Sequence, residues 1–458
     1  MRRPNVLFLH TDQQRWDTIH AGGNELIATP NLDALAARGA LFQNAFTNNP
    51  VCMPSRQSML SGQYPSTIGT TCNGIEMRED VPTIYQILKP YGYHAACLGK
   101  LHFLNHSNRD HRQPHPSYGF DTLVISDEPG CYDDAYIAWV RERGASQVEN
   151  CRCSTPPAWK GTPVVKHGRN THEPYVFEGP EELTHTAFVA ETTCEYIRRH
   201  ADEPFFAFAG FYAPHCPLNP PKRFVDMYDP SMLPSPVMND GENRLGLSDD
   251  EWRVVKQYYW ALITHIDDQV GRIFATLDEC GLTDDTFVVF TSDHGEHLGD
   301  HGLIQKGSPG YDSCVHVPLI VSWPGHIHEG AVHSELIELV DIAPTILDCC
   351  GVQTPPFFQG RSFRALLEGR EYRERSSVLI EEKMPFTHSW KVVRDHDYKY
   401  CVSGAGEELL FDLNADPHEL RNVAAHASSE PALHRMRAEL LRRWFDIESQ
   451  YPLRTGDY

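Results

Sequence analysis

The sequence contains no long uninterrupted hydrophobic run. No stretch of its 458 residues approaches the roughly 20 apolar residues that a helix needs to cross a bilayer. The apolar run near the start, Val6 to Leu9, stops at Thr11 and Asp12, and it is too short for the hydrophobic region of a signal peptide. We therefore expect neither a membrane-spanning segment nor an export signal, and we expect a cytoplasmic protein.

Positive charge is also scarce. Lys and Arg total 40 against 62 Asp and Glu, which gives a formal net charge of −22. The average field of such a chain repels phosphate, so nucleic acid and anionic membranes are not expected partners. If the protein handles an anion, cations gathered at one place must do so.

Neither internal repeats nor low-complexity segments are present. Apolar residues make up 41% and charged residues 22%, the usage of a folded domain, which excludes wholesale disorder. The 13 cysteines are an odd number scattered through a large chain. Without an export signal we expect them to be mostly reduced core residues.

Strand-like and helical patterns alternate over residues 1 to about 350. The expected strands are 5–11, 205–212, 286–291 and 315–323, and the expected helices are 30–39, 82–89, 181–200, 249–280 and 340–350. This alternation predicts an α/β fold with a mostly parallel central sheet flanked by helices. In such folds, ligands bind beyond the carboxyl ends of the strands.

The pattern changes in the last part of the chain. Short strands are expected at 377–381, 390–394, 398–402 and 409–413, followed by a helix at 430–449. We therefore predict an α/β domain over residues 1–370 and a smaller C-terminal α+β subdomain over residues 371–458. Two long stretches rich in Pro, His and Asn, 103–180 and 213–248, carry no clear pattern, and we expect them to line a pocket.

Polar residues with metal-binding atoms follow two of the expected strands. Asp12 and Gln13 end the first, and Asp293 and His294 follow the strand at 286–291. If these strands are neighbours, two carboxylates, an amide and an imidazole converge, a set that favours Ca²⁺, Mg²⁺ or Mn²⁺ over zinc. The alternative is that both aspartates only cap the helix or turn that follows.

Cys52 begins a second segment of interest, which reads Cys-Met-Pro-Ser-Arg-Gln-Ser-Met-Leu-Ser-Gly. Pro54 suits a first helical turn and Gly62 suits a helix end, which places Cys52 at a helix N-terminus, where an anion is stabilised. A plain thiol at this place is expected to be acidic and nucleophilic. A buried structural cysteine is the alternative.

The segment from Cys52 to Arg56, with Pro65 beyond it, resembles the Cys-x-Pro-Ser-Arg modification motif of the type I sulfatases, members of the alkaline phosphatase-like superfamily. A second motif of that family resembles residues 92–102, which end in Gly-Lys-Leu-His. Ala95 departs from the Ser or Thr usual there. Asp12, residues 213–217, 293–296, 301–306 and 317–320 and the stretch 411–422 follow in family order, so the likeness covers nearly the whole chain.

This resemblance implies a function and a site. In the family, the cysteine is oxidised to formylglycine by a formylglycine-generating enzyme, and the hydrated aldehyde attacks sulfur, giving a covalent sulfo-enzyme intermediate. The implied metal ligands are Asp12, Gln13, Cys52, Asp293 and His294. The implied catalytic residues are Cys52, Arg56, Lys100, His102, His215 and Lys306.

Within the resemblance, each residue has an expected role. Arg56 is expected to hold the nucleophile. The groups expected to surround the sulfate are Lys100, His102, His215 and Lys306. His215 or Lys306 protonates the departing alcohol, and His102 takes a proton from the second hydroxyl of the diol, which releases sulfate. Many family members carry Asp-Asp where this chain has Asp-Gln, so the site has one negative charge fewer; the implied metal is Ca²⁺, with Mg²⁺ and Mn²⁺ as alternatives.

The expected activity is hydrolysis of a sulfate ester or sulfamate, and the substrate a small aryl, carbohydrate or choline-like sulfate. A phosphonate monoester or phosphodiester hydrolase of the same superfamily is the main alternative. A noncatalytic sulfate- or metal-binding protein with unmodified Cys52 is a third. Outside the family frame, Lys100, Lys306, His102 and His215 are ordinary surface or loop residues. A homo-oligomer is compatible with this sequence.

Overall fold

The computed structural model describes residues 3–106, 110–111, 113–152, 172–383 and 389–448. Within these residues, eight strands form one sheet in the order β5-β4-β6-β1-β7-β8-β2-β9. The strands are β1 (Asn5–Asp12), β2 (Gly39–Phe42), β4 (His94–Gly99), β5 (Thr122–Ile125), β6 (Phe205–Pro214), β7 (Thr286–Ser292), β8 (Leu319–Ser322) and β9 (Ala331–His333).

Most of this sheet is parallel. Strands β5, β4, β6, β1 and β7 all run in one direction. Strand β8 runs against both β7 and β2. Every residue of β1 and β7 is buried, as expected for central strands covered on both faces. The predicted α/β class with a mostly parallel sheet is confirmed.

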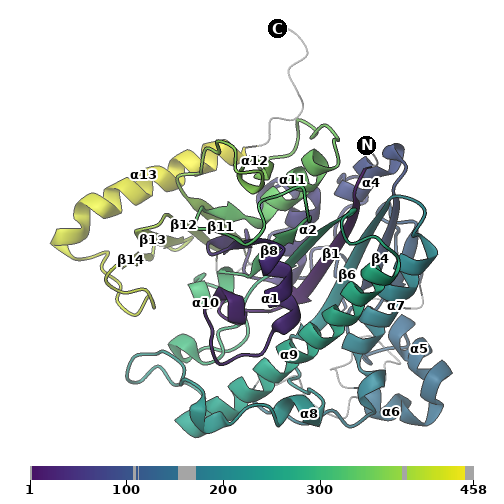
Figure 1. Cartoon of the computed structure of the whole chain (residues 1–458). Coiled ribbons are helices and arrows are strands. Elements are labelled where there is room, and N and C mark those ends of the chain that lie inside the picture. The colour runs from purple at the N-terminus through teal and green to yellow at the C-terminus, as the bar shows by residue number, and fades with distance from the viewer. Residues whose placement is uncertain (1–2, 107–109, 112, 153–171, 384–388, 449–458) are drawn as a thin grey trace, which may run out of the picture.

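Helices cover both faces of the sheet because alternate residues of each strand point to opposite sides. On β1, Leu7 and Leu9 join one hydrophobic cluster, and Val6 and Phe8 join the other. The first cluster includes residues of α1 (Pro30–Ala37), α5 (Ala135–Gly144), α6 (Val148–Cys151), α7 (His185–Arg199), α8 (Lys222–Val225) and α9 (Asp249–Glu279). The second includes residues of α2 (Cys52–Ser61), α3 (Pro65–Ile68), α4 (Ile84–Leu88), α11 (Ile342–Cys349) and α12 (Arg364–Leu367). Figure 1 shows α7 and α9 lying along the same face.

A second, antiparallel sheet carries the C-terminal part. It consists of β11 (Val378–Lys383), β12 (Ser389–Arg394), β13 (Tyr398–Ser403) and β14 (Glu408–Asp412). Helix α13 (Glu430–Ile447) packs Leu433 and Met436 against Tyr400 and Leu410 of this sheet (Figure 1). The predicted α+β subdomain is therefore confirmed, while a boundary at residue 370 stays a prediction.

The other face of the small sheet packs on the main part of the chain. Val378 and Val392 share a cluster with Phe46 of β3 (Ala45–Phe46) and Val315 of α10 (Asp312–Val315). Strand β3 pairs with β10 (Ile337–Glu338). This packing places β11 close to the segment that leads into α2.

Some expectations about local structure are wrong. The strand expected at 315–323 begins only at Leu319, because Val315 ends α10 and its side chain is buried without being in a strand. The stretch 103–180, left without a pattern, contains β5, α5 and α6, and its residues 153–171 lie outside those described.

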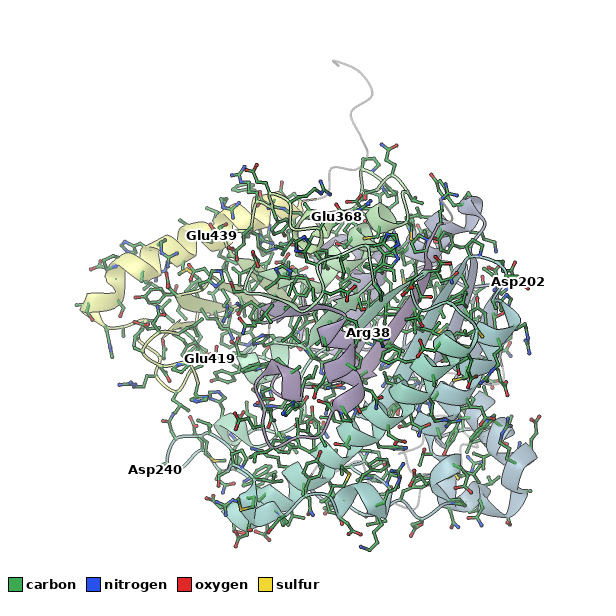
Figure 2. The ribbon with its side chains drawn as sticks, viewed as in Figure 1. Arg38, Asp202, Asp240, Glu368, Glu419 and Glu439 are labelled. Atoms are coloured by element: carbon green, nitrogen blue, oxygen red, sulfur yellow. The ribbon has the colours of Figure 1, made fainter. Side chains whose placement is uncertain are left out.

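The surface and the cysteines agree with the composition. Charged side chains such as Asp202 and Asp240 lie at the periphery of the fold and are exposed (Figure 2). In the part of the chain that the structure describes, every cysteine is free of disulfide bonds. Across the same residues, no helix combines the length and the apolar character that crossing a membrane requires.

Candidate active site

The ends of four parallel strands bring the site together. Strands β1 and β7 are adjacent and parallel, so Asp12, which ends β1, lies beside Asp293, which follows β7. On the other side of β1, β6 leads to His215, and the next strand, β4, leads to Lys100. The arrangement matches the rule that ligands bind at the carboxyl edge of a parallel sheet.

Two glycines allow β4 and β6 to approach closely just before Lys100. A Cβ atom on Gly99 would lie 2.2 Å from the carbonyl oxygen of Gly210, and one on Gly210 would lie 2.1 Å from the carbonyl oxygen of Lys100. Gly99 also has a φ of 100°, a conformation that side chains disfavour. Glycine at both positions therefore lets the chain turn so that Lys100 enters the site.

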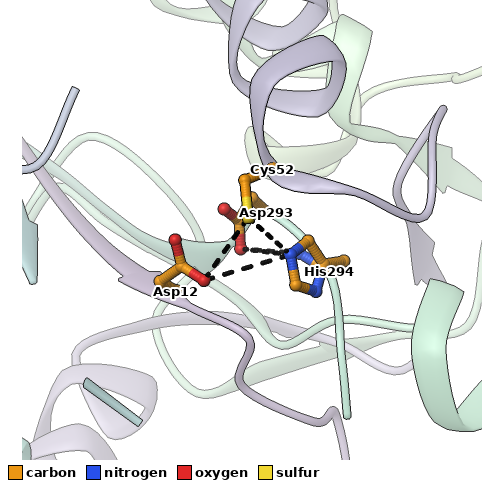
Figure 3. Close-up of side chains that lie close together, drawn as sticks. All are labelled: Asp12, Cys52, Asp293 and His294. Atoms are coloured by element: carbon orange, nitrogen blue, oxygen red, sulfur yellow. Dashed lines mark hydrogen bonds and ion pairs between the residues drawn. The ribbon is translucent and has the colours of Figure 1, made fainter. Parts of the chain in front are cut away.

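Four buried side chains meet at this edge. Each of Asp12, Cys52, Asp293 and His294 offers a ligand atom, and these atoms lie within 4.8 Å of one another (Figure 3). The sulfur of Cys52 lies 3.2 Å from Nε2 of His294 and 3.8 Å from Oδ1 of Asp12. Segments that lie more than 280 residues apart in sequence thus form one cluster of potential metal ligands.

Gln13 supplies a fifth potential ligand. Its backbone N–H donates to Oδ1 of Asp293 at 3.0 Å, and its side-chain Nε2 donates to Glu296. Its amide oxygen is buried and has no hydrogen-bond partner among the described residues. A buried carbonyl oxygen without a partner is costly unless something binds it. An orphaned side-chain oxygen on the residue that follows Asp12 is the kind of donor that a hard divalent cation prefers.

Arg56 ties the two carboxylates together. Its Nε donates to Oδ2 of Asp293 at 2.7 Å, its Nη2 to Oδ2 of Asp12 at 3.0 Å, and its Nη1 to the carbonyl oxygen of Lys100 at 3.0 Å. The guanidinium is fully buried. The sequence led us to expect Arg56 to hold the nucleophile, whereas its hydrogen bonds go to the two aspartates and to the backbone.

Cys52 is the first residue of α2 and is fully buried. Helix α2 ends, as predicted, at Gly62, which adopts the left-handed conformation. Burial, followed by the carboxylate of Asp12, raises the pKa of the Cys52 thiol. We expected a plain thiol at this helix N-terminus to be acidic. With the charged side chains of the protein alone around it, the thiol is less acidic than an ordinary cysteine, so that expectation is wrong.

Two lysines bring positive charge into the site. Nζ of Lys306 lies 2.8 Å from the sulfur of Cys52, and Nζ of Lys100 lies 2.8 Å from Oδ2 of Asp12. Lys100 also stands 4.5 Å above the ring of Tyr212. Burial acts to raise the pKa of Asp12, but Lys100, His215, Arg56 and Lys306 outweigh it and hold that pKa well below its usual range. Asp12 is therefore a carboxylate.

The two histidines occupy the same edge. His102 follows β4 in a strained backbone conformation (φ 57°), and its backbone N–H donates to Asp127 at 2.8 Å. Burial, and after it the nearby His106 and Lys100, hold the pKa of His102 well below its usual value, so the imidazole is neutral. His215 lies near enough to Asp12 to lower the pKa of that carboxyl. The structure thus brings all the residues singled out from the sequence to one place.

Three supporting residues were not singled out from the sequence. Glu296 accepts hydrogen bonds from Gln13 and from the backbone N–H of Leu298 at 3.1 Å. The hydroxyl of Tyr259 donates to the carbonyl oxygen of Gln13 at 2.6 Å, and Tyr212 supports Lys100. Glu296 stands in the motif that follows β7, which is a usable signal. The two tyrosines lie within apolar patterns and give none.

Known proteins resemble this chain over most of its length. The Sulfatase family matches residues 4–352, and the family described as N-sulphoglucosamine sulphohydrolase, C-terminal, matches residues 299–445. An arylsulfatase of Clostridium perfringens is 30% identical over 483 residues, covering 98% of this chain and 96% of the relative. The multifunctional alkaline phosphatase superfamily protein PehA of Trinickia caryophylli is 30% identical over 482 residues, covering 93% and 92%.

A solved structure agrees in fold. The phosphonate monoester hydrolase of Agrobacterium radiobacter superposes with a TM-score of 0.86 at 26% identity, covering 98% of this chain and 97% of the other. The family match extends from the first strand to the end of α11 and includes both aspartates and Cys52. The chain belongs to the sulfatase family of sulfuric ester hydrolases.

Proposed function

We propose that the protein hydrolyses a sulfate ester or sulfamate by means of a formylglycine formed from Cys52, through a covalent sulfo-enzyme intermediate. The observation that carries the proposal is the position of residue 52. It begins α2, faces Asp12 and His294, and lies 2.8 Å from the ammonium group of Lys306.

The residues at the site fit one divalent cation, proposed as Ca²⁺, with Mg²⁺ and Mn²⁺ as alternatives. The proposed ligands are Asp12, Gln13, Asp293, His294 and residue 52. Oxygen atoms predominate in this set, which favours Ca²⁺ over zinc. When bound, the ion would lower the pKa of a hydroxyl attached to it and polarise a sulfate oxygen.

Lys100 and Lys306 supply the charge that an anionic group requires. Lys100 is fully buried and Lys306 lies against residue 52, so both ammonium groups act in surroundings of low dielectric constant. We assign to them the binding of the sulfate oxygens, where fixed cations stabilise charge that develops during the reaction.

Proton transfers fall to the histidines in this proposal. His215, or Lys306 in its place, gives a proton to the departing alcohol. His102, neutral because it is buried, accepts a proton as sulfate leaves residue 52. Arg56 keeps Asp12 and Asp293 in position for the cation, which is the role its contacts support.

The proposed partners are a formylglycine-generating enzyme and a small sulfated molecule whose organic part is aryl, carbohydrate or choline-like. The modifying enzyme must act on the chain before α2 is buried, because every residue of α2 from Cys52 to Ser61 is buried in the folded protein. We therefore place the modification before folding is complete.

Mass analysis of the peptide that contains residue 52 tests the proposal. The protein is produced with and without a co-expressed modifying enzyme, and sulfate release from an aryl sulfate is measured beside the Cys52→Ala variant. We expect activity to follow the fraction of formylglycine and to be lost in Cys52→Ala. Full activity in Cys52→Ala, or in a sample with only the unmodified thiol, would end the proposal.

Phosphonate monoester or phosphodiester hydrolysis is the second candidate. Two observations favour it: an amide, Gln13, stands among the potential ligands, and the fold superposes on a phosphonate monoester hydrolase. Lys100, His102 and Lys306 favour sulfate as our first choice. Initial rates on matched aryl sulfate, phosphate monoester, phosphodiester and phosphonate substrates decide the matter, and a clear preference for the phosphonate would overturn the first choice.

A further inference from the structure

The segment after β4 is rich in histidine, and the proposed reaction uses only part of it. His102, His106, His111 and His115 follow one another within a short stretch. Of these, only His102 has a role in the proposed chemistry. Histidine-rich tracts are typical metal-binding segments, and His106 is a candidate ligand in this one.

His102, His106 and Glu128 form a second cluster of metal-binding atoms. One ligand atom from each lies within 4.8 Å of the others. Nε2 of His106 lies 3.5 Å from Oε1 of Glu128, and the rings of His102 and His106 are stacked with centroids 4.5 Å apart. We call these three residues the histidine–glutamate cluster.

The cluster is buried and one of its atoms lacks a partner. His102 and Glu128 are 6% and 3% exposed. Nδ1 of His102 is buried and has no hydrogen-bond partner among the described residues. Since its ring meets His106 by stacking, the neighbouring imidazole does not remove this deficit. A buried ring nitrogen without a partner points to a ligand that binds it.

Two loops hold the cluster in place. The backbone N–H groups of Leu101 and His102 both donate to Oδ1 of Asp127, at 2.7 and 2.8 Å. Glu128 is the next residue, so the same short segment that fixes His102 also supplies the carboxylate. The backbone beside both ligands is therefore fixed before any ion arrives, which reduces the entropy lost on binding. The stacked ring of His106 has to turn about its side-chain bonds so that both imidazoles point at one ion.

The donor set identifies the kind of ion. Two imidazoles and one carboxylate, with a fourth position for water, form a common zinc set, whereas Ca²⁺ prefers oxygen ligands alone. This second cluster thus differs in chemistry from the oxygen-rich one around Asp12.

We propose that the histidine–glutamate cluster binds one Zn²⁺ ion and that zinc there inhibits the enzyme. The inhibition rests on the proposed function, because it follows from the use of His102 as a base. An imidazole that is coordinated to zinc through the lone pair of a ring nitrogen cannot accept a proton at that atom. The zinc site itself stands on the geometry alone.

Zinc binding, measured without reference to activity, tests the site. The protein is titrated with Zn²⁺ against a chromophoric chelator in saturating Ca²⁺, which keeps the site around Asp12 filled. We expect wild type to bind one ion that His106→Asn and Glu128→Gln bind at least about tenfold more weakly. His434→Asn is the control, because His434 is exposed on α13 and its ion-pair partner is Glu430 of the same helix, and it should bind like wild type.

Activity is measured in the same samples. Zinc should inhibit wild type and His434→Asn, and the two cluster variants should require at least about tenfold more zinc for the same inhibition. Equal zinc binding by wild type and both cluster variants would overturn the proposal. Zinc binding that is lost in the variants without any inhibition of wild type would keep the site and refute its inhibitory role.

Wild-type crystals grown with zinc give a measurement that does not depend on how the variants fold. Anomalous scattering at the zinc edge should show a peak bonded to His102, His106 and Glu128. Absence of that peak at a zinc concentration that saturates the titration would refute the proposed site. A preparation that contains formylglycine, shows no sulfatase activity in the absence of zinc and still gives the peak would reject the proposed function and leave the zinc site intact.

Discussion

Replacing Arg56 by methionine should destabilise the protein strongly, and calcium should reduce the loss. The guanidinium is completely buried and bonds Asp293, Asp12 and the carbonyl oxygen of Lys100. Methionine occupies a similar volume but leaves two buried carboxylates facing each other. Removing one partner from a buried ionic network costs about 3–5 kcal/mol.

A divalent cation at the two carboxylates should reduce the loss of stability in Arg56→Met. If Asp12 and Asp293 bind Ca²⁺, the ion restores positive charge beside them, so the destabilisation should be smaller in saturating Ca²⁺ than in chelator. Arg56→Lys keeps the charge but not the planar fork that reaches both carboxylates, and it should fall between wild type and Arg56→Met.

Denaturant unfolding followed by circular dichroism, in chelator and in excess Ca²⁺, measures these differences. Arg78→Met is the control, because Arg78 is exposed and its ion-pair partner is the exposed Asp80, and exposed pairs contribute about 0–1 kcal/mol. If Arg56→Met unfolded like Arg78→Met, the claim that this guanidinium holds the carboxylates would be refuted. If the loss were the same with and without Ca²⁺, the two carboxylates would not share an ion.

Three further predictions concern the reaction and the response to acid. His215→Asn should reduce kcat/KM about 10²- to 10⁴-fold for alkyl sulfates and much less for nitrophenyl sulfate, whose leaving group needs no proton; an equal loss on both substrates would exclude His215 as the acid. Lys306→Ala should lower kcat/KM about 10²- to 10³-fold and weaken inhibition by inorganic sulfate, with formylglycine content checked by mass; unchanged kinetics would remove Lys306 from the site. Burial lowers the pKa of His265 from 6.5 to about 3 in the folded protein. As the pH falls below 6.5, His265 therefore becomes protonated in the unfolded chain but not in the folded one, and the free energy of unfolding decreases. The unfolding free-energy difference between wild type and His265→Gln should therefore narrow by about 2 kcal/mol from pH 8 to pH 5, and a constant difference would contradict this account.

Much of the fold could be predicted because local patterns of apolar and polar residues indicate its helices and strands. Helix α9 begins with a capping box in which Ser248 and Glu251 satisfy each other's backbone N–H groups. The helix is amphipathic along its length, with one apolar face. The predicted range 249–280 is therefore within one residue of the observed one. Strands β1, β6 and β7 are apolar runs buried on both faces, which a sequence shows directly.

Other elements depend on packing that a sequence does not display. Strand β4 reads His-Ala-Ala-Cys-Leu-Gly, which has little intrinsic strand preference, and it forms because it lies between β5 and β6. Strand β2 begins at Gly39, which the sequence presents as a helix end. A Cβ atom there would lie 2.2 Å from the carbonyl oxygen of Val321, so the glycine serves the close approach of β8.

The site shows the same division. The meeting of Asp12 and Asp293 follows from a general rule about strand ends once the strands are neighbours. The position of Arg56 does not follow, because a residue one turn into α2 can face either the nucleophile or the acids behind it. Only the packing of α2 against the carboxyl edge, with Ser55 donating to the carbonyl oxygen of Asp293 at 2.7 Å, decides between them.

The charge of the site resolves the conflict between an acidic chain and an anionic substrate. Beside the two carboxylates of Asp12 and Asp293 stand three cationic side chains, Arg56, Lys100 and Lys306, so positive charge is gathered at this place within a protein of net charge −22. A divalent ion between the carboxylates adds two more positive charges. All five side chains are buried or lie against residue 52, where charges act over short distances with little screening. The surface charge is spread over the exposed side chains at the periphery and is screened by salt, so it influences the approach of a substrate but not its binding.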